Sequence, residues 1–198
     1  MKQRLYLFFI VLLAFLSSFG QKVRIIPKVG FVVSDLTNQK LASTDDYTQT
    51  VDSKLLMGKT AGVDFEYSCF NHFDLICGLS YTQQGCSFKN VVDKKGEIQK
   101  NKLHYDYLNL PLKLKYRITE GLGISTGIVF GYLVRAKHNN EDVKSICNKF
   151  DSSLPISISY EFRNNLLVEV SYHVGLKNVY DEGSTKNRSL ICLIGFKF

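Results

Sequence analysis

Charged side chains recur at alternate positions within otherwise apolar stretches of this sequence, where they could form buried ion pairs. Asp64 and Glu66 flank Phe65 in one stretch, and Lys113 and Lys115 flank a leucine in another. Burying such a charge is costly unless an opposite charge pairs with it. We therefore predict a network of ion pairs inside the folded protein. Its candidate members, on the polar sides of their stretches, are Asp64, Glu66, Asp74, Glu169, Lys113, Lys115, Arg135 and Lys197.

No recognisable catalytic or metal-binding pattern accompanies these charges. The four histidines are scattered and lack the His-Glu-x-x-His spacing of a zinc site. His104 and Asp106 alternate and could form an acid–base pair, but no nucleophile motif lies beside them. The glycines at 121, 123 and 127 miss the dinucleotide-binding spacing by one residue, and no helix is expected after them. We therefore expect no enzyme activity, no cofactor and no metal ion.

The five cysteines are odd in number, so at least one has no disulfide partner within the chain. Three of them lie in apolar alternating stretches, where a cysteine packs as a small hydrophobic residue. Cys86 and Cys147 fall in expected loops and are the two that could pair. The sequence leaves open whether they do.

The elements that must position the charges are strands. After residue 20 no window has a sustained helical period, whereas apolar and polar residues alternate along the rest of the chain. Eight strands are expected, at about 23–34, 56–69, 73–85, 103–117, 122–136, 151–160, 166–176 and 188–198.

The connections between these strands alternate strictly in length. Long polar loops are expected at 35–55, 86–102, 137–150 and 177–187, and short turns at 70–72, 118–121 and 161–165. Outer-membrane barrels combine short periplasmic turns with long outward loops. The pattern therefore predicts an all-β fold, an eight-stranded antiparallel up-and-down transmembrane β-barrel spanning 21–198. If the two strands on either side of each short turn are aligned as a hairpin, Cys69 lies opposite Phe73, Tyr116 opposite Leu122, and Tyr160 opposite Leu166.

The size of the side chains predicts which face of the barrel points outward. The apolar face would overfill the interior of an eight-stranded barrel, whereas the other face is rich in Gly, Ser and Thr. Four apolar residues on the polar face count against this orientation: Ile76, Leu133, Ile191 and Leu193. Aromatic residues near the short turns fit an interfacial girdle: Tyr67, Phe73, Tyr116, Tyr160, Phe196 and Phe198. The alternative is a secreted, soluble lipocalin-like barrel that binds a small apolar ligand in an apolar interior.

The N-terminus predicts export. Lys2 and Arg4 precede an apolar run from Leu5 to Leu16, and small residues follow, so 1–20 has the three parts of a signal peptide. The run is too short for a spanning helix. The formal charge of +7 could suggest nucleic acid, but export and the lack of a clustered basic patch with interleaved aromatics exclude that partner.

The mature chain resembles a family of small outer-membrane β-barrels from Bacteroidetes-type bacteria, the PorT-like barrels. The segments that carry the resemblance are Pro27–Gly30, Leu79–Gly85, Tyr107–Lys113, Gly127–Leu133 and Gly195–Phe198. The last strand, with Phe196 and Phe198, resembles the signal recognised by the bacterial barrel-insertion machinery. The resemblance implies the fold and a bacterial outer-membrane location. It carries no catalytic signature, and the link of PorT to protein secretion is not transferred.

The expected function is therefore a structural or loop-mediated binding role for a barrel with a narrow, plugged lumen. Its expected partners are outer-membrane lipid, the insertion machinery, and an envelope protein or glycan. Anionic contact is expected at the loop that carries Lys89, Lys94, Lys95, Lys100 and Lys102, although these lysines could equally be solvated. A further alternative is an accessory component of a secretion or envelope-assembly complex.

Overall fold

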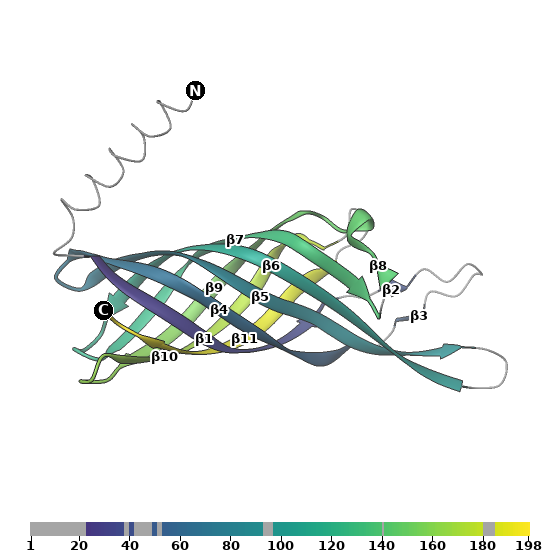
Figure 1. Ribbon diagram of the computed structural model, residues 1–198, viewed down its shortest axis with the longest axis horizontal. Coiled ribbons are helices and arrows are strands. Elements are labelled where there is room, and N and C mark those ends of the chain that lie inside the picture. The colour runs from purple at the N-terminus through teal and green to yellow at the C-terminus, as the bar shows by residue number, and fades with distance from the viewer. Residues whose placement is uncertain are drawn as a thin grey trace, which may run out of the picture.

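The protein folds into a closed antiparallel barrel (Figure 1). The computed structural model describes residues 23–37, 40–41, 49–50, 53–92, 97–139, 141–179 and 185–198, so the predicted signal peptide at 1–20 lies outside the described residues. The barrel strands are β1 (Val23–Leu36), β4 (Ser53–Phe70), β5 (Phe73–Val92), β6 (Glu97–Arg117), β7 (Leu122–His138), β9 (Phe150–Glu161), β10 (Leu166–Asn178) and β11 (Lys186–Phe196).

Each barrel strand pairs with its neighbours in sequence, and β1 closes the ring against β11. All of these pairings are antiparallel, which confirms the predicted up-and-down topology. The start of β1 and the end of β11 lie at the same end as the short turns (Figure 1). The long connections hold the short elements β2 (Lys40–Leu41), β3 (Gln49–Thr50), β8 (Glu141–Asp142) and η1 (Lys144–Ile146). No helix in the described ranges is long and apolar enough to cross a membrane.

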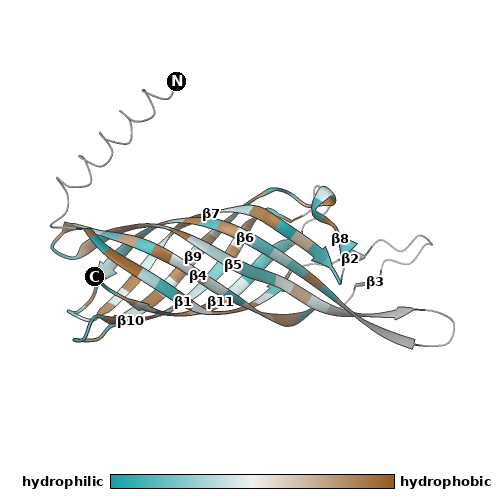
Figure 2. Cartoon of the chain, viewed as in Figure 1, coloured by the Kyte–Doolittle hydropathy of each residue, from teal (hydrophilic) through white to brown (hydrophobic). Residues whose placement is uncertain are grey.

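The apolar face of the strands points outward. Brown and teal bands alternate along the strands in Figure 2, and most of the large apolar side chains on the strands are exposed. Phe31 is 62% exposed and Ile194 56%, although each lies within a strand that is paired on both sides. Because a soluble barrel would bury these side chains, the lipocalin-like alternative is wrong. The apolar residues Ile76, Leu133 and Ile191 do point inward and are buried.

The predicted partners across the short turns are wrong in detail. Phe73 pairs with Phe70, because a bulge at Cys69 adds a residue to β4. Tyr116 pairs with Ile124. Tyr160 pairs with Val168. In the last two cases the partner moves by two residues, which keeps the same face, so the orientation of the side chains is retained.

Two glycines make room for charged side chains in the lumen. A Cβ added at Gly195 would lie 2.7 Å from Cγ of Lys28 on the neighbouring strand. A Cβ at Gly123 would lie 2.6 Å from Cε of Lys115. The glycine on one strand therefore gives the lysine on the next strand the space to extend across a narrow interior.

Candidate functional site

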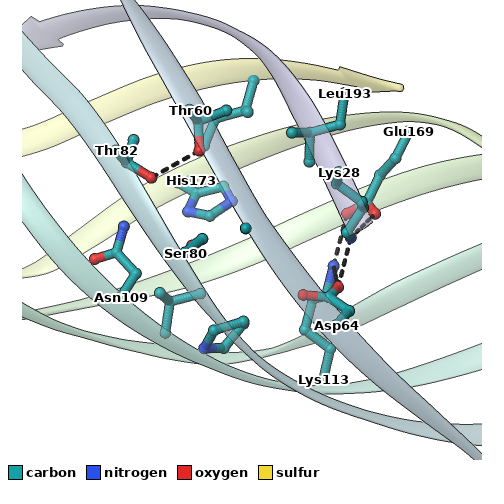
Figure 3. Close-up of a pocket in the computed structure, with 14 residues that line it drawn as sticks. Lys28, Thr60, Asp64, Ser80, Thr82, Asn109, Lys113, Glu169, His173 and Leu193 are labelled. Atoms are coloured by element: carbon teal, nitrogen blue, oxygen red, sulfur yellow. Dashed lines mark hydrogen bonds and ion pairs between the residues drawn. The ribbon is translucent and has the colours of Figure 1, made fainter. Parts of the chain in front are cut away.

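The middle of the lumen holds a closed ring of four ion-paired side chains, which we call the central quartet: Lys28, Asp64, Lys113 and Glu169 (Figure 3). Nζ of Lys28 lies 2.5 Å from Asp64 and 2.8 Å from Glu169. Nζ of Lys113 lies 2.6 Å from Glu169 and 3.9 Å from Asp64. Two cations from β1 and β6 thus share two anions from β4 and β10. The charges of the quartet balance, which is the condition for burying it.

A second group of ion pairs surrounds Glu66, between the quartet and the short turns. Its carboxylate lies 3.0 Å from Nζ of Lys115 and 2.7 Å from Nζ of Lys197. Arg24 approaches the same carboxylate at 3.7 Å, and Lys197 also contacts Glu161 at 2.5 Å. Because Lys197 follows the last strand, this group ties the C-terminus of the chain to β4, β6 and β9.

A third ion pair lies beside the first short turn. Nε of Arg117 is 3.1 Å from Oδ2 of the fully buried Asp74. The other carboxylate oxygen of Asp74 accepts a hydrogen bond of 2.8 Å from the Ser68 hydroxyl. Arg24 in turn donates to Ser68 at 3.1 Å, so this pair is linked to the Glu66 group.

The structure brings most of the predicted ion network together but places Arg135 elsewhere. The predicted residues that lie in the lumen and form these ion pairs are Asp64, Glu66, Asp74, Lys113, Lys115, Glu169 and Lys197. Arg135 is exposed on the outer surface, which corrects its assignment to the lumen. Asp106 pairs with Arg135 and Tyr107 with Leu133, so Val134 is an extra residue. This bulge reverses the alternation beyond it.

Four members of the network were not predicted: Arg24, Lys28, Arg117 and Glu161. Each of them lies an even number of positions from the inward-facing residues of its own strand, so it is expected to face inward as well. Arg117, for example, continues the series of Lys113 and Lys115 along β6. The alternation that identified the other residues could therefore have identified these four as well.

The lumen also contains neutral polar contacts. The hydroxyls of Thr60 and Thr82 lie 2.9 Å apart (Figure 3), and those of Ser157 and Ser171 lie 2.8 Å apart. Nearer the outer mouth, Asn187 donates to Asp151 at 2.7 Å. These contacts join β4 to β5, β9 to β10, and β11 to β9.

An apolar cluster closes the outer mouth of the lumen, and we call it the outer plug. Its largest members are Tyr105 and Tyr107, which are 0% and 2% exposed. The cluster joins side chains from β1, β5, β6, β7 and the long connections: Leu36, Cys86, Leu103, Tyr105, Tyr107, Leu133, Ala136, Cys147 and Val179. Leu133, an apolar residue on the predicted polar face, therefore has a clear role in packing.

The space left between the central quartet and the outer plug is small. A cavity of about 50 Å³ adjoins the quartet, Thr60 and His173 (Figure 3). A second cavity of about 10 Å³ lies nearer the outer mouth, beside Tyr107 and Asn187. Since one water needs roughly 10–15 Å³ of such volume, these two cavities have room for a few water molecules but not for a larger ligand.

The remaining candidate residues lie at the outer end. His104 is exposed, whereas Asp106 is buried and lies opposite Arg135 on β7. Cys86 and Cys147 both lie in the outer plug, and no disulfide joins them in the structure. Burial, together with the nearby charge of Asp142, raises the pKa of the Cys147 thiol to about 11. That thiol is therefore protonated at neutral pH and unreactive.

Two belts of aromatic side chains mark the ends of the apolar outer surface. The belt beside the short turns contains exposed rings in mutual contact, with centroids 5.1 Å apart for Phe73 and Tyr116 and 5.0 Å apart for Phe196 and Phe198. The other belt, nearer the outer end, contains Phe31, Tyr81, Phe130, Tyr132, Phe150 and Tyr172. From Phe73 to Tyr81 the chain rises about 26 Å along β5. At a tilt of about 40° this gives about 20 Å along the barrel axis, close to the height of an apolar band in a membrane barrel.

Comparisons with known proteins agree with this geometry. The sequence profile described as "Outer membrane protein beta-barrel domain" matches residues 18–181. No curated protein matches the chain in sequence. Among solved structures, Ail, the attachment invasion locus protein of Yersinia pestis, in complex with the heparin analogue sucrose octasulfate, is 16% identical. That alignment covers 89% of this chain and 99% of that chain, with a TM-score of 0.50.

A second solved structure is the outer membrane protein OprG from Pseudomonas aeruginosa. It is 11% identical, and the alignment covers 89% of this chain and 96% of that chain with a TM-score of 0.43. At these identities the structural likeness concerns the fold alone.

Proposed function

Because the chain belongs to the family of outer membrane protein β-barrel domains, we propose that it acts as a channel-free barrel that works through its outer surface. The family places the chain in the bacterial outer membrane. The proposal adds that the lumen is a structural core and that the outer end of the barrel binds the partner.

The closure of the lumen at two levels supports this proposal. The central quartet crosses the middle of the barrel, and the outer plug fills its mouth. Ions would have to break the pairing of Lys28 and Lys113 with their carboxylates in order to pass. Removing one partner of a buried pair is strongly destabilising, so a conducting state would compete with the fold itself.

The character of the outer end supports a binding role. Among the lysines expected to contact anions, Lys102 is exposed, whereas the side chains of Lys89, Lys94, Lys95 and Lys100 lie outside the described part. The structurally similar protein Ail has been crystallised with a heparin analogue, sucrose octasulfate. A closed barrel that presents a binding surface above the membrane is consistent with both observations.

Conductance measurements test the channel-free barrel. The mature protein, refolded in detergent and added to a planar lipid bilayer, should give no ohmic current steps in molar KCl. A porin added to the same bilayer afterwards shows that insertion events would have been detected. Reproducible steps whose frequency follows the amount of folded protein would contradict the proposal.

A further inference from the structure

Exposed basic side chains gather on the outward face of the barrel wall just beyond the outer aromatic belt. We define the outer basic face by Lys54 on β4, Lys102 and His104 on β6, and Arg135 and Lys137 on β7. All of these except Lys137 are exposed, and Lys137 is partly exposed. The face therefore concentrates positive charge on the part of the wall that continues the lipid-facing surface.

The register of the strands sets these residues in successive rows. Lys54 lies opposite Ser87, and Ser87 lies opposite Lys102, so both lysines belong to one row. His104 lies opposite Lys137, and Asp106 opposite Arg135, in the next two rows towards the membrane. Directly opposite side chains, such as His104 and Lys137, are about 4.5–5.5 Å apart at Cβ. Lys54 and Lys102 are two strands apart, at about 10 Å. An anionic group that contacts two cations must therefore reach from one row or strand to another.

The backbone that carries Lys102 is fixed. Its amide donates to Oδ1 of Asn139 at 3.0 Å, and its carbonyl accepts from the Asn139 amide at 2.8 Å. These reciprocal bonds join Lys102 of β6 to the residue that follows β7. The backbone position of Lys102 is consequently set before any ligand binds.

Two acidic groups lie opposite cations of this face. The buried Asp106 lies opposite Arg135, and the exposed Asp142 lies opposite Lys137. Asp142 also accepts a hydrogen bond of 2.9 Å from the Lys144 amide, and the exposed Glu141 is its neighbour on β8. Further exposed or partly exposed cations continue around the outer end: Lys59, Lys144, Lys149, Lys177, Lys186 and Arg188. Among the described residues of the outer end, exposed cations therefore outnumber exposed acids.

The face begins in the headgroup layer and extends above it. Tyr81, Leu108 and Tyr132 form the last row of the apolar surface, since Leu108 lies opposite both of the other two. Along β6, the row of Arg135 lies about 7 Å and Lys102 about 20 Å beyond this row. At a strand tilt of about 40° these rows are about 5 Å and about 15 Å above the aromatic belt, and a headgroup layer is about 5–8 Å thick.

We propose that the outer basic face binds the phosphate groups of a phosphorylated glycolipid in the outer leaflet of the membrane. Clusters of Lys and Arg beside a membrane surface attract anionic headgroups. The position of the face on the outside of the wall, directly above the lipid-facing surface, favours a lipid over a soluble ligand. This inference goes beyond the proposed function, because it concerns the wall of the barrel and not a partner held by the loops.

Native mass spectrometry of the folded mature protein in zwitterionic micelles tests this assignment, with diphosphoryl lipid A as the probe. The neutral variant carries Lys102→Gln, Arg135→Gln and Lys137→Gln. The charge-keeping variant carries Lys102→Arg, Arg135→Lys and Lys137→Arg. Arg163→Gln removes a cation at the other end of the barrel. Unboiled samples that migrate on a gel differently from boiled samples show that each variant is folded.

Wild-type protein, the charge-keeping variant and Arg163→Gln should bind diphosphoryl lipid A alike. The neutral variant should bind it at least about tenfold more weakly. Fully dephosphorylated lipid A should show a similar loss of affinity for the wild-type protein. Equal binding of lipid A by the neutral variant would show that the outer basic face is not the binding site. If soluble sucrose octasulfate competes with lipid A and binds equally or more tightly, the face binds a soluble polyanion, and the assignment to a lipid is wrong. A barrel that conducts ions yet passes these tests would contradict only the proposed function.

Discussion

Each buried charge in the lumen depends on a partner that is far away in the sequence. Glu169 accepts hydrogen bonds from Lys28, which lies 141 positions away, and from Lys113, which lies 56 positions away. The alternation of residues predicts that these side chains face inward. It does not predict which of them meet, because that depends on how the barrel closes.

Replacing Glu169 tests the central quartet. In Glu169→Ala, the buried Lys28 and Lys113 must share Asp64 alone, so we expect the free energy of unfolding to fall by about 3–5 kcal/mol. The loss should appear as a lower midpoint of urea unfolding in lipid micelles, followed by heat-shift gel electrophoresis.

The matched control is the double variant Lys113→Met with Glu169→Leu. It removes one cation and one anion and leaves the close pair of Lys28 with Asp64 intact. Since apolar replacements of a whole buried pair are often neutral, most of the lost stability should return. An unchanged midpoint in Glu169→Ala would show that the quartet does not stabilise the barrel.

At the level of the strand, bulges decide which side chains leave the predicted face. The parity of β7 correctly predicts inward positions as far as Leu133, which is fully buried. Val134 then interrupts the register, so Arg135 points outward and Ala136 inward. A bulge depends on the pairing of two strands, and the alternation within one strand does not reveal it.

The final strand supports a prediction about assembly. The backbone of Phe198 bonds to Ile25 in both directions, at 2.9 and 3.3 Å, whereas its ring is 73% exposed. If Phe196 and Phe198 act as an insertion signal, Phe198→Ser should lower the amount of heat-modifiable protein in the outer membrane severalfold while refolding in detergent stays efficient. Leu190→Ser, an exposed residue of the same strand, is the control. Equal membrane levels for all three proteins would exclude the signal.

For the whole molecule, the outward apolar surface determines how the protein behaves in solution. The folded mature protein should require detergent or lipid, since a broad band of exposed apolar side chains surrounds it. On a gel, the unboiled barrel should migrate differently from the boiled chain, because the folded form is compact. A folded, monomeric protein without detergent would be inconsistent with the membrane barrel.

The sequence by itself determined the class of fold, the number of barrel strands and the direction of most side chains. It could do so because alternation along a strand and the lengths of the connections are local properties. Only the tertiary structure decided which charges pair, that Arg135 lies outside, and that an apolar plug closes the outer mouth. These features arise from side chains of several strands that meet across a narrow lumen, and their partners are chosen by register, bulges and ring closure.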